Sequence, residues 1–346
     1  MNDSTGKVPR LAVVTGATGL LGSNIVRALL AGGGEVTAIV RDPERARQLL
    51  PRADGLRLLA GDMRQVEGFA SALRGVDAVF HTAAYFREYY QPTRDLALLR
   101  RINVDAVGEL LRAASGAGVP TVVHISSSSA IDPPPGGVAA TEDTPLLAHA
   151  RNGYTASKVQ AEDLVRAFRE DHAMRVPVIV PGWMWGPGDA GPTSAGRLFL
   201  SIARRQLRAI PDAGNHMVDA RDVAAACVRA AVDGCTGRYI VGGVWRSLPE
   251  ICFAVARATG VPPPRVVPMR VALSAVTVME FQARLRGRQP TATRTGVRAL
   301  IEGNRRRVSS ARAEKEFGIA SRPLEETLQD EAAWYHEHGL LAKPVS

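Results

Sequence analysis

Tyr154 and Lys158 are the residues of this sequence whose types and spacing are best suited to proton chemistry. They lie four positions apart at the start of Tyr154–Phe168, where the apolar spacing predicts a helix, so both side chains project from one face. Tyrosine is a poor base at its ordinary pKa of about 10, and a neighbouring ammonium favours the phenolate. The pair is therefore a candidate for proton transfer.

A run of four serines, residues 126–129, follows a predicted strand, Thr121–Ser126. In parallel α/β sheets, ligands bind at the carboxyl edge, where such a strand ends. A serine hydroxyl at this edge can hydrogen-bond a substrate oxygen while Tyr154 passes the proton. A Tyr-x-x-x-Lys pair is common by chance, so the serine run is part of what makes this pair a specific signal.

A glycine-rich turn at residues 16–22 directly follows a predicted strand and precedes a predicted helix. Glycines permit a tight turn, let backbone amides approach a pyrophosphate, and allow the helix to pack closely on the strand. The positive end of the helix then faces the phosphates. The turn predicts a dinucleotide site. The residues expected to contact the cofactor there are Gly16, Thr18, Gly19, Leu20, Leu21 and Gly22.

The residues after the second and third strands bear on which dinucleotide is bound. Arg41 suits the 2′-phosphate of NADP through charge-assisted hydrogen bonds, whereas an acidic residue near this point binds the ribose hydroxyls of NAD. Because of Arg41 we expect NADP. Asp42 directly follows Arg41, so NAD remains the alternative. Asp62 is placed either to meet the adenine, together with Met63, or to cap the following helix.

Short β-branched runs alternate with helical patterns through the first half of the chain, which is typical of a parallel α/β sheet. We expect a Rossmann-type, doubly wound parallel sheet in residues 1–182. The predicted strands are Leu11–Thr15, Glu35–Val40, Leu56–Ala60, Ala78–Thr82, Thr121–Ser126 and Val176–Val180. The predicted helices between them are Asn24–Ala31, Glu44–Leu50, Val66–Leu73 and Leu96–Ala114.

After about residue 182 the alternation ends. Residues 183–346 are expected to form mainly a smaller, mixed substrate-binding lobe, with a return to the sheet around residues 215–243. Residues 132–138 and 181–195 are predicted to be loops. Later elements are predicted as a strand at Arg238–Val241 and helices at Asp222–Val232, Ser247–Ala258, Val271–Leu285 and Leu324–His338.

A chain of 346 residues is long enough for about two domains. Hydrophobic residues make up 46% of it and charged residues 22%, a composition that excludes a disordered chain. The longest apolar runs are far shorter than the roughly 20 residues of a membrane span. Residues 1–7 are polar and contain no apolar signal core. Cys227, Cys235 and Cys252 form no pair motif, so we expect a reduced, cytoplasmic protein without a structural metal.

The net charge of +9 comes mainly from one stretch. Nine arginines and one acid, Glu302, lie between Arg284 and Arg312, a balance of +8, which leaves +1 for the rest of the chain. A nucleic-acid site usually carries aromatic residues between the charges, and only Phe281 lies near this stretch. We therefore expect a solvated or substrate-facing surface and no nucleic-acid partner.

Together these motifs resemble the extended short-chain dehydrogenase/reductase family (the NAD-dependent epimerase/dehydratase superfamily), in its dihydroflavonol-reductase-like and sugar-epimerase-like branch. The similarity covers nearly the whole chain and includes Pro181–Asp189, which is similar to the family's Pro-x-x-Val-Tyr-Gly-Pro segment. The resemblance implies that Ser127, Tyr154 and Lys158 form the catalytic triad, with Ser128 as the fallback serine.

The resemblance also assigns supporting roles. Ala83, Ala84 and Pro181 would line the cofactor, to which Tyr154 and Lys158 would also bind, and Asn103 would have a structural role. In the sugar dehydratases of the family an Asp-Glu pair follows the catalytic threonine. This chain has two serines at those positions, so dehydration is not expected.

Aromatic residues gather on the two loops expected to form the substrate pocket. Tyr85, Phe86 and Tyr89 follow the fourth strand, and Trp183 and Trp185 lie in the segment 181–195. Aromatic side chains in a pocket favour flat or apolar substrates. The alternative is that some of them pack the interface between the lobes.

We therefore predict an NADP(H)-dependent oxidoreductase that reduces a ketone or aldehyde of an apolar or aromatic small molecule, with a homodimer as a compatible assembly. One alternative is a sugar-nucleotide 4-epimerase, which uses the same triad but retains tightly bound NAD. The other is a non-catalytic dinucleotide sensor, although such sensors typically lose the Tyr/Lys pair.

Overall fold

The computed structural model describes residues 7–86, 95–150, 152–285 and 294–342. Its main feature is a seven-stranded sheet in which every neighbouring pair is parallel, with the order β3-β2-β1-β4-β5-β6-β10. The order reverses direction between β1 and β4, so the predicted doubly wound sheet is confirmed. The strands are β1 (Leu11–Thr15), β2 (Glu35–Val40), β3 (Leu56–Ala60), β4 (Ala78–His81), β5 (Val122–Ile125), β6 (Val178–Pro181) and β10 (Arg238–Val241).

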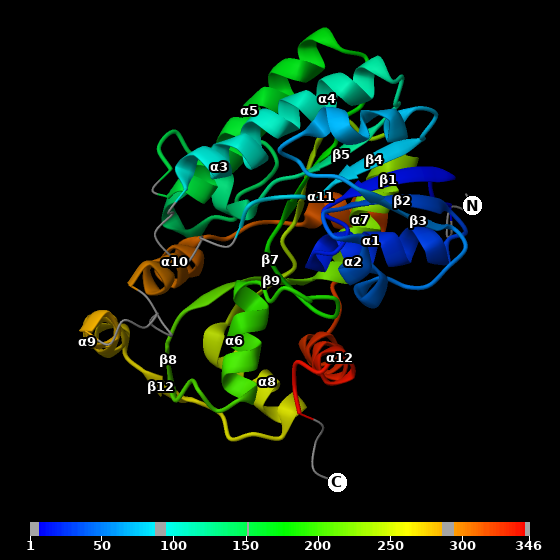
Figure 1. The fold of residues 1–346 in the computed structure, drawn as a ribbon. Helices are drawn as coiled ribbons and strands as arrows, with labels where there is room; N and C mark the ends of the chain where they lie inside the picture. Colours follow the sequence, from blue (N-terminus) through cyan, green and yellow to red (C-terminus); the bar gives the residue numbers. More distant parts are fainter. Residues whose placement is uncertain (1–6, 87–94, 151, 286–293, 343–346) are drawn as a thin grey trace.

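Helices cover both faces of this sheet (Figure 1). The central strands β4, β5 and β6 are buried at every residue, as expected for strands covered on both sides. One face is covered mainly by α1 (Leu20–Ala31), α2 (Pro43–Leu49) and α7 (Ala220–Val232). The other face carries η1 (Val66–Leu73), α4 (Ala106–Gly116) and α5 (Gly153–Asp171). Each face has its own hydrophobic core.

The helix predicted at Leu96–Ala114 differs in detail. It is divided into α3 (Leu96–Arg100), a π-helical turn η2 (Arg101–Asp105) and α4. A π turn holds one more residue than an α turn, and apolar periodicity alone does not reveal it. The segment Val66–Leu73 is likewise a 3₁₀ helix rather than an α-helix.

The C-terminal lobe is mixed, as predicted, and has a third hydrophobic core. Its three-stranded sheet has the order β11-β9-β7, and a two-stranded sheet pairs β12 with β8. The strands are β7 (Trp183–Trp185), β8 (Ala209–Pro211), β9 (Gly214–Asp219), β11 (Val244–Ser247) and β12 (Arg265–Val267). The helices are α6 (Ser194–Ala203), α8 (Leu248–Thr259), α9 (Met269–Leu285), α10 (Arg294–Arg305), α11 (Ala311–Phe317) and α12 (Leu324–Glu337).

The prediction of a loop at residues 181–195 is partly wrong, because this segment contains β7 and the start of α6. Three-residue strands such as β7 are defined by their pairing with a distant strand, here β9, and leave little local signal. Between β9 and β11 the chain returns to the main sheet through α7 and β10, where β10 pairs with β6.

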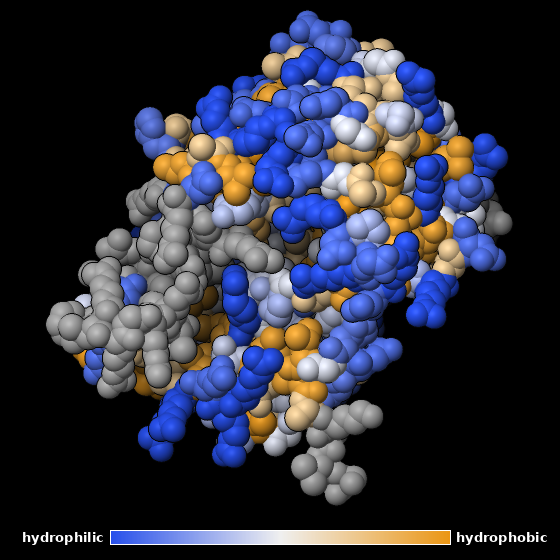
Figure 2. All heavy atoms as spheres, viewed as in Figure 1, coloured by the Kyte–Doolittle hydropathy of each residue, from blue (hydrophilic) through white to orange (hydrophobic). Residues whose placement is uncertain are grey.

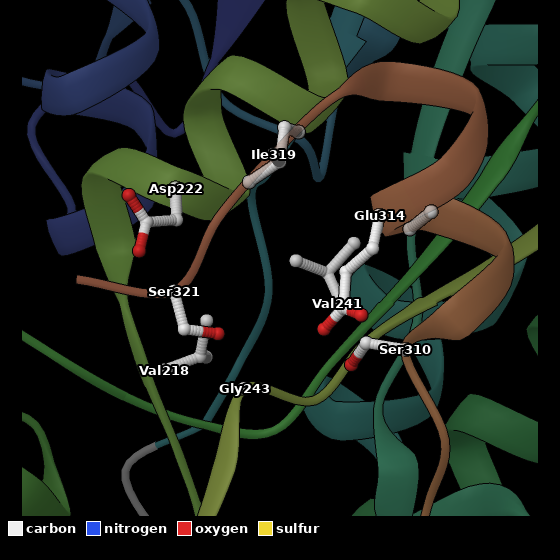
Figure 3. A pocket seen from close by; sticks show the side chains of 9 residues that line it. Val218, Asp222, Val241, Gly243, Ser310, Glu314, Ile319 and Ser321 are labelled. Atoms are coloured by element: carbon white, nitrogen blue, oxygen red, sulfur yellow. The ribbon is translucent and has the colours of Figure 1, made fainter.

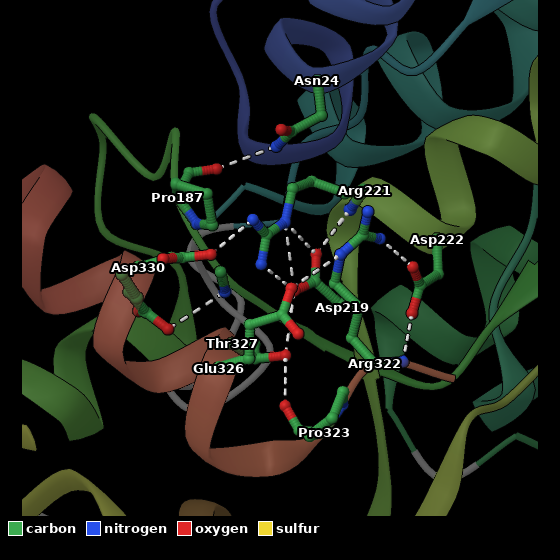
Figure 4. A network of polar contacts seen from close by, with 12 residues as sticks. Asn24, Pro187, Asp219, Arg221, Asp222, Arg322, Pro323, Glu326, Thr327 and Asp330 are labelled. Atoms are coloured by element: carbon green, nitrogen blue, oxygen red, sulfur yellow. Dashed lines mark hydrogen bonds and ion pairs between the residues drawn. The ribbon is translucent and has the colours of Figure 1, made fainter. Parts of the chain in front are cut away.

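A buried carboxylate, Asp219, connects α12 to α7, a helix that packs on the main sheet (Figure 4). Asp219 begins α7 and accepts hydrogen bonds from the backbone of Arg221 at 2.7 Å and from Thr327 Oγ1 of α12 at 2.9 Å. The guanidinium of Arg221 binds both Asp219, at 2.7 Å, and Asp330 of α12, at 2.6 Å. Asp222 pairs with Arg322 just before α12. These contacts tie the end of the chain to α7.

A small pocket lies beside this network (Figure 3). Its lining comes from β9, α7, the end of β10 and the segment that runs from α11 towards α12. Aliphatic side chains such as Val218, Val241 and Ile319 form much of its wall. None of the predicted site residues lines it.

The surface shown in Figure 2 carries hydrophilic side chains over both lobes, with smaller hydrophobic groups between them. Across the described ranges of the chain, no helix is both long and apolar enough to cross a membrane.

We predict that Asp219→Ala lowers the free energy of unfolding by about 3 kcal/mol, because it leaves the partners of a buried ion pair without their acceptor. Urea unfolding measures the change. Glu325→Ala is the matched control, since its ion pair with Arg257 is solvent-exposed and is worth less than about 1 kcal/mol. Equal effects of the two substitutions would contradict the role of Asp219.

Candidate active site

Helix α5 places Tyr154 and Lys158 together at the carboxyl edge of the sheet. The helix begins after Asn152, whose side chain accepts a hydrogen bond from the backbone of Thr155 at 2.8 Å. Tyr154 lies in the first turn and Lys158 one turn later, with Lys158 Nζ 5.9 Å from the centre of the Tyr154 ring. Both side chains are buried. The structure thus brings the predicted pair into proximity.

Lys158 is a buried ammonium held against the end of β5. Its Nζ donates a hydrogen bond to the carbonyl oxygen of Ile125 at 2.8 Å. Burial lowers the pKa of Lys158 to about 8, and the carboxylate of Glu162 acts in the opposite direction. This pKa lies nearer to neutral pH than that of an ordinary lysine.

Two buried histidines lie in the strands near Lys158. His81 and His124 stack with ring centres 5.7 Å apart, and His81 Nδ1 is 2.8 Å from Thr15 Oγ1. Burial lowers the pKa of His81 to about 3 and that of His124 well below its usual value, and the charge of Lys158 adds to both shifts. Both rings are therefore neutral, as expected for histidines buried in the core.

Glu162 belongs to this site, although sequence reasoning missed it. It lies one turn after Lys158 on α5, accepts a hydrogen bond from Ser126 Oγ, and has Arg238 Nε of β10 at 3.2 Å. Burial raises the pKa of Glu162, whereas the Arg238 charge lowers it. The signal was available in the sequence, because Tyr154, Lys158 and Glu162 follow the i, i+4, i+8 spacing of one helix face.

The four serines have different environments. Ser126 is buried on Glu162, and Ser129 is buried against the first turn of α5, where Thr155 Oγ1 is 3.4 Å from Ser129 Oγ. Ser127 and Ser128 are half-buried. Ser127 caps the short helix η3 (Ser128–Ala130), and its Oγ is 2.9 Å from Ser129 Oγ. Ser127 and Ser128 therefore keep the greater exposure that contact with a substrate requires.

Asn103 joins the loop after β4 to α5. In the π turn η2, its Oδ1 accepts a hydrogen bond from the backbone of Tyr85 at 2.7 Å. Its Nδ2 donates to the carbonyl of Tyr85 at 3.1 Å and to Ser157 Oγ at 3.0 Å, while Ser157 Oγ donates to the carbonyl of Tyr154 at 2.7 Å. The Phe86 ring then packs edge-on against the Tyr154 ring, with centres 4.8 Å apart.

The glycine turn fits a dinucleotide pyrophosphate. Gly16 has a positive φ of 70°, and a Cβ on it would lie 2.6 Å from the backbone nitrogen of Ala83. A Cβ on Gly22 would overlap the carbonyl oxygen of Gly16. Gly19 begins α1 without a side-chain cap, so backbone amides are the groups presented at this helix end. Close packing thus excludes side chains at the place where phosphates would approach.

Around the turn, Thr18 is half-buried and Leu20 and Leu21 are buried. On the cofactor's expected path, Ala83 is half-buried, Ala84 is exposed, and Met63 and Pro181 are buried.

The acids near the expected adenosine site already have partners. Asp42 caps α2 by accepting a hydrogen bond from the backbone of Arg45 at 3.0 Å. Asp62 accepts hydrogen bonds from the backbone and from Nη2 of Arg64, both at 2.8 Å. The bond from Arg64 lowers the pKa of Asp62, and the charge of Arg41 acts in the same direction, which places Arg41 near Asp62. Arg41 itself is exposed.

The predicted substrate residues are only partly suited to contact a substrate. Tyr85 and Phe86 are half-buried near the Tyr154–Lys158 pair, whereas Tyr89 lies outside the described residues. Trp183 is half-buried and donates from its Nε1 to Ser194 Oγ at 3.2 Å. Trp185 is fully buried in the core of the C-terminal lobe, so for this residue the packing alternative fits and the substrate prediction does not.

Part of the arginine-rich stretch is structural. Arg306 Nη2 donates to the carbonyl oxygen of Ser129 at 3.5 Å, which brings this stretch to the serine run. The Arg307 guanidinium stacks 4.2 Å from the centre of the Trp245 ring, and Arg312 pairs with Glu316. Arg306 and Arg307 are half-buried and so do not fit a solvated surface, whereas Arg312 is exposed, as expected.

This chain is similar to known proteins over nearly its whole length. The model of the NAD dependent epimerase/dehydratase family matches residues 12–242. The sterol demethylase protein B of Methylococcus capsulatus (strain ATCC 33009 / NCIMB 11132 / Bath) is 31% identical over 340 residues, which cover 95% of this chain and 99% of that protein. This chain belongs to the NAD-dependent epimerase/dehydratase family.

Two further proteins are similar to this chain over nearly their whole length. A putative dihydroflavonol 4-reductase of Synechocystis sp. (strain ATCC 27184 / PCC 6803 / Kazusa) is 30% identical and covers 94% of both chains. The crystal structure of gox2253 is 31% identical, with a TM-score of 0.79, and covers 96% of this chain and 99% of that one. The extended short-chain dehydrogenase/reductase resemblance is thereby confirmed.

We predict that the buried Lys158 ammonium destabilises the folded state less as the pH rises, because the lysine loses its proton in the folded chain first. Between about pH 8, the pKa in the folded chain, and about 10.5 in the unfolded chain, the unfolded state binds more protons, so the contribution of Lys158 to stability increases with pH. The difference in unfolding free energy between Lys158→Met and the wild type should fall by about 1.4 kcal/mol per pH unit in this range.

Urea unfolding at several pH values measures this difference. Lys315→Met is the control, because the exposed Lys315 ammonium is in water in both states. A pH-independent difference for Lys158→Met would show that Lys158 is not a buried, charged group at neutral pH.

Proposed function

We propose that this protein is an NADP(H)-dependent reductase that converts a ketone or aldehyde on an apolar or aromatic small molecule into an alcohol. The observation that carries the proposal is the buried Tyr154–Lys158 pair at the carboxyl edge of the sheet, beside the serine run. Two relatives that cover 94–95% of this chain carry the names sterol demethylase protein B and putative dihydroflavonol 4-reductase, and both names refer to ring compounds.

The chain's own residues supply binding, orientation and the proton. Ser127 donates a hydrogen bond to the substrate carbonyl and polarises it, and Tyr154 gives its hydroxyl proton to the same oxygen. Lys158 holds the nicotinamide ribose and stabilises the phenolate that remains on Tyr154. The bound dinucleotide, with its pyrophosphate at residues 16–22, would supply the hydride. Phe86 packs on Tyr154 and limits access of water to this position.

We predict that Tyr154→Phe reduces turnover by about 10²–10⁴-fold, the usual contribution of a general acid, while NADPH binding stays nearly intact. The substitution keeps the ring that packs on Phe86 and removes only the hydroxyl. The assay follows NADPH absorbance with a panel of carbonyl compounds and sugar nucleotides. Tyr239→Phe, on β10, is the matched control and should keep wild-type turnover. Wild-type turnover in Tyr154→Phe would reject the proposed proton donor.

The choice of NADP rests on Arg41. Asp42 already accepts a hydrogen bond from the backbone of Arg45 as the cap of α2, whereas Arg41 is exposed at the end of β2, where a 2′-phosphate would lie. We predict that Arg41→Ala weakens NADPH binding about 10- to 100-fold, the value of one charge-assisted contact, and hardly alters NADH binding. Calorimetric titration of both cofactors measures the effect.

Arg74→Ala is the control for this titration, because Arg74 is an exposed arginine after η1, outside the proposed site. Equal losses for the two cofactors in Arg41→Ala, or tighter binding of NADH by the wild type, would overturn the choice of NADP. Either result, together with a copurifying NAD, would favour the sugar-nucleotide 4-epimerase.

A further inference from the structure

Exposed hydrophobic side chains are concentrated in one short part of the C-terminal lobe. Across the described residues, seven large hydrophobic side chains are exposed, and four of them lie between residues 266 and 279. These four are Val266, Val271, Val278 and Met279. Single exposed hydrophobic residues are normal, but a local group of them marks an interaction site.

Three of the four lie on one face of α9. Val271 is 52% exposed, Val278 55% and Met279 39%, and Ala275 between them is also exposed. These residues occupy positions i, i+4, i+7 and i+8, which is the spacing of a single helical stripe. We call this stripe, residues 271, 275, 278 and 279, the α9 face.

An adjacent side of α9 faces the protein. Ala272 and Val276 are buried, and the helix packs against β8 and α10. Figure 1 shows α9 at the outer edge of the C-terminal lobe, beyond β8 and β12. Helix α9 therefore already buries one apolar side against the protein, and the α9 face is a second, exposed apolar surface.

The residues around the α9 face are basic. Arg265 and Arg270 are exposed just before it, and the sequence continues after it with three arginines, Arg284, Arg286 and Arg288. The only acid between residues 265 and 288 is Glu280. In the sequence, the α9 face thus precedes the stretch, residues 284–312, that contains most of the net positive charge of the chain.

This charge selects among the possible partners. A second copy of the chain docked through the same face would bring two strongly basic stretches together, which is unfavourable. A nucleic acid would match the charge but offers no apolar surface for valine and methionine. A bilayer with anionic headgroups satisfies both, since the aliphatic side chains enter the acyl boundary and the arginines remain with the phosphates.

We propose that the α9 face docks the protein on membranes that contain anionic phospholipid. The helix lies in the plane of the interface, with its buried side still packed on β8 and α10. This mode needs no spanning segment, in agreement with the finding that none of the described helices can cross a membrane.

The test is co-flotation of the full chain with two kinds of vesicle, one of phosphatidylcholine alone and one with about a third phosphatidylglycerol. We expect binding to the anionic vesicles, weakened by salt. The triple variant Val271→Ser, Val278→Ser, Met279→Ser should bind at least about tenfold more weakly, because the apolar contribution is lost. Arg265→Gln and Arg270→Gln should each weaken binding about fivefold.

Val138→Ser is the matched control, because Val138 is 62% exposed but lies far from α9 in the sequence, in a segment between β5 and α5. It should bind vesicles like the wild type. Circular dichroism and dinucleotide binding, unchanged in all variants, establish that the substitutions leave the fold intact.

Several outcomes would overturn the proposal. These are absent binding, equal binding to both vesicles, or a triple variant that binds like the wild type. A dimer in light scattering that the triple variant converts to a monomer would assign the face to a second copy. Displacement from vesicles by duplex DNA, with DNA binding unchanged in the triple variant, would assign the basic stretch to nucleic acid.

Discussion

Burying the Lys158 ammonium at the carboxyl edge of the sheet requires compensation from several elements at once. Its nitrogen donates to the carbonyl of Ile125, and Glu162 supplies a negative charge one turn further along α5. Glu162 is held in turn by Ser126 and by Arg238. A buried charge without such partners would cost several kcal/mol. Strand β5, helix α5 and strand β10 therefore all contribute groups that accommodate this one buried charge.

The same helix also determines the position of the loop after β4. Asn103 lies in the π turn η2 and forms hydrogen bonds with both Tyr85 and Ser157. The extra residue in a π turn changes the direction in which the side chains of the helix point. Phe86 is thereby packed against Tyr154, and the loop is joined to the helix that carries the proposed proton donor. A local irregularity of the backbone thus serves the geometry of the site.

The two lobes depend on a different kind of contact. Asp219 is a fully buried carboxylate that joins α7 to α12, so the end of the chain is attached to the dinucleotide-binding sheet and not only to its own lobe. Helix α9 packs against β8 and α10, and Ala272 and Val276 lie on its buried side. Val271, Val278 and Met279 remain on its outer surface.

Much of the main sheet was predictable from the sequence because its determinants are local. The bounds of β1, β2, β3 and β10 agree with those predicted, since each is a short run rich in apolar or β-branched residues that is flanked by turn residues. The Tyr154–Lys158 pair was predictable for the same reason, because four residues make one helical turn. The glycine turn at residues 16–22 was equally recognisable from its spacing.

Only the tertiary structure decided which of these residues share an environment. The sequence could not distinguish the serine bound to Glu162 from those left half-exposed, or show that Trp185 is core while Phe86 lies on Tyr154. It also gave no sign of the three-residue strand β7 or of the partners of Asp219. Each of these depends on contacts between residues far apart in the chain, and such contacts leave no periodicity in the local sequence.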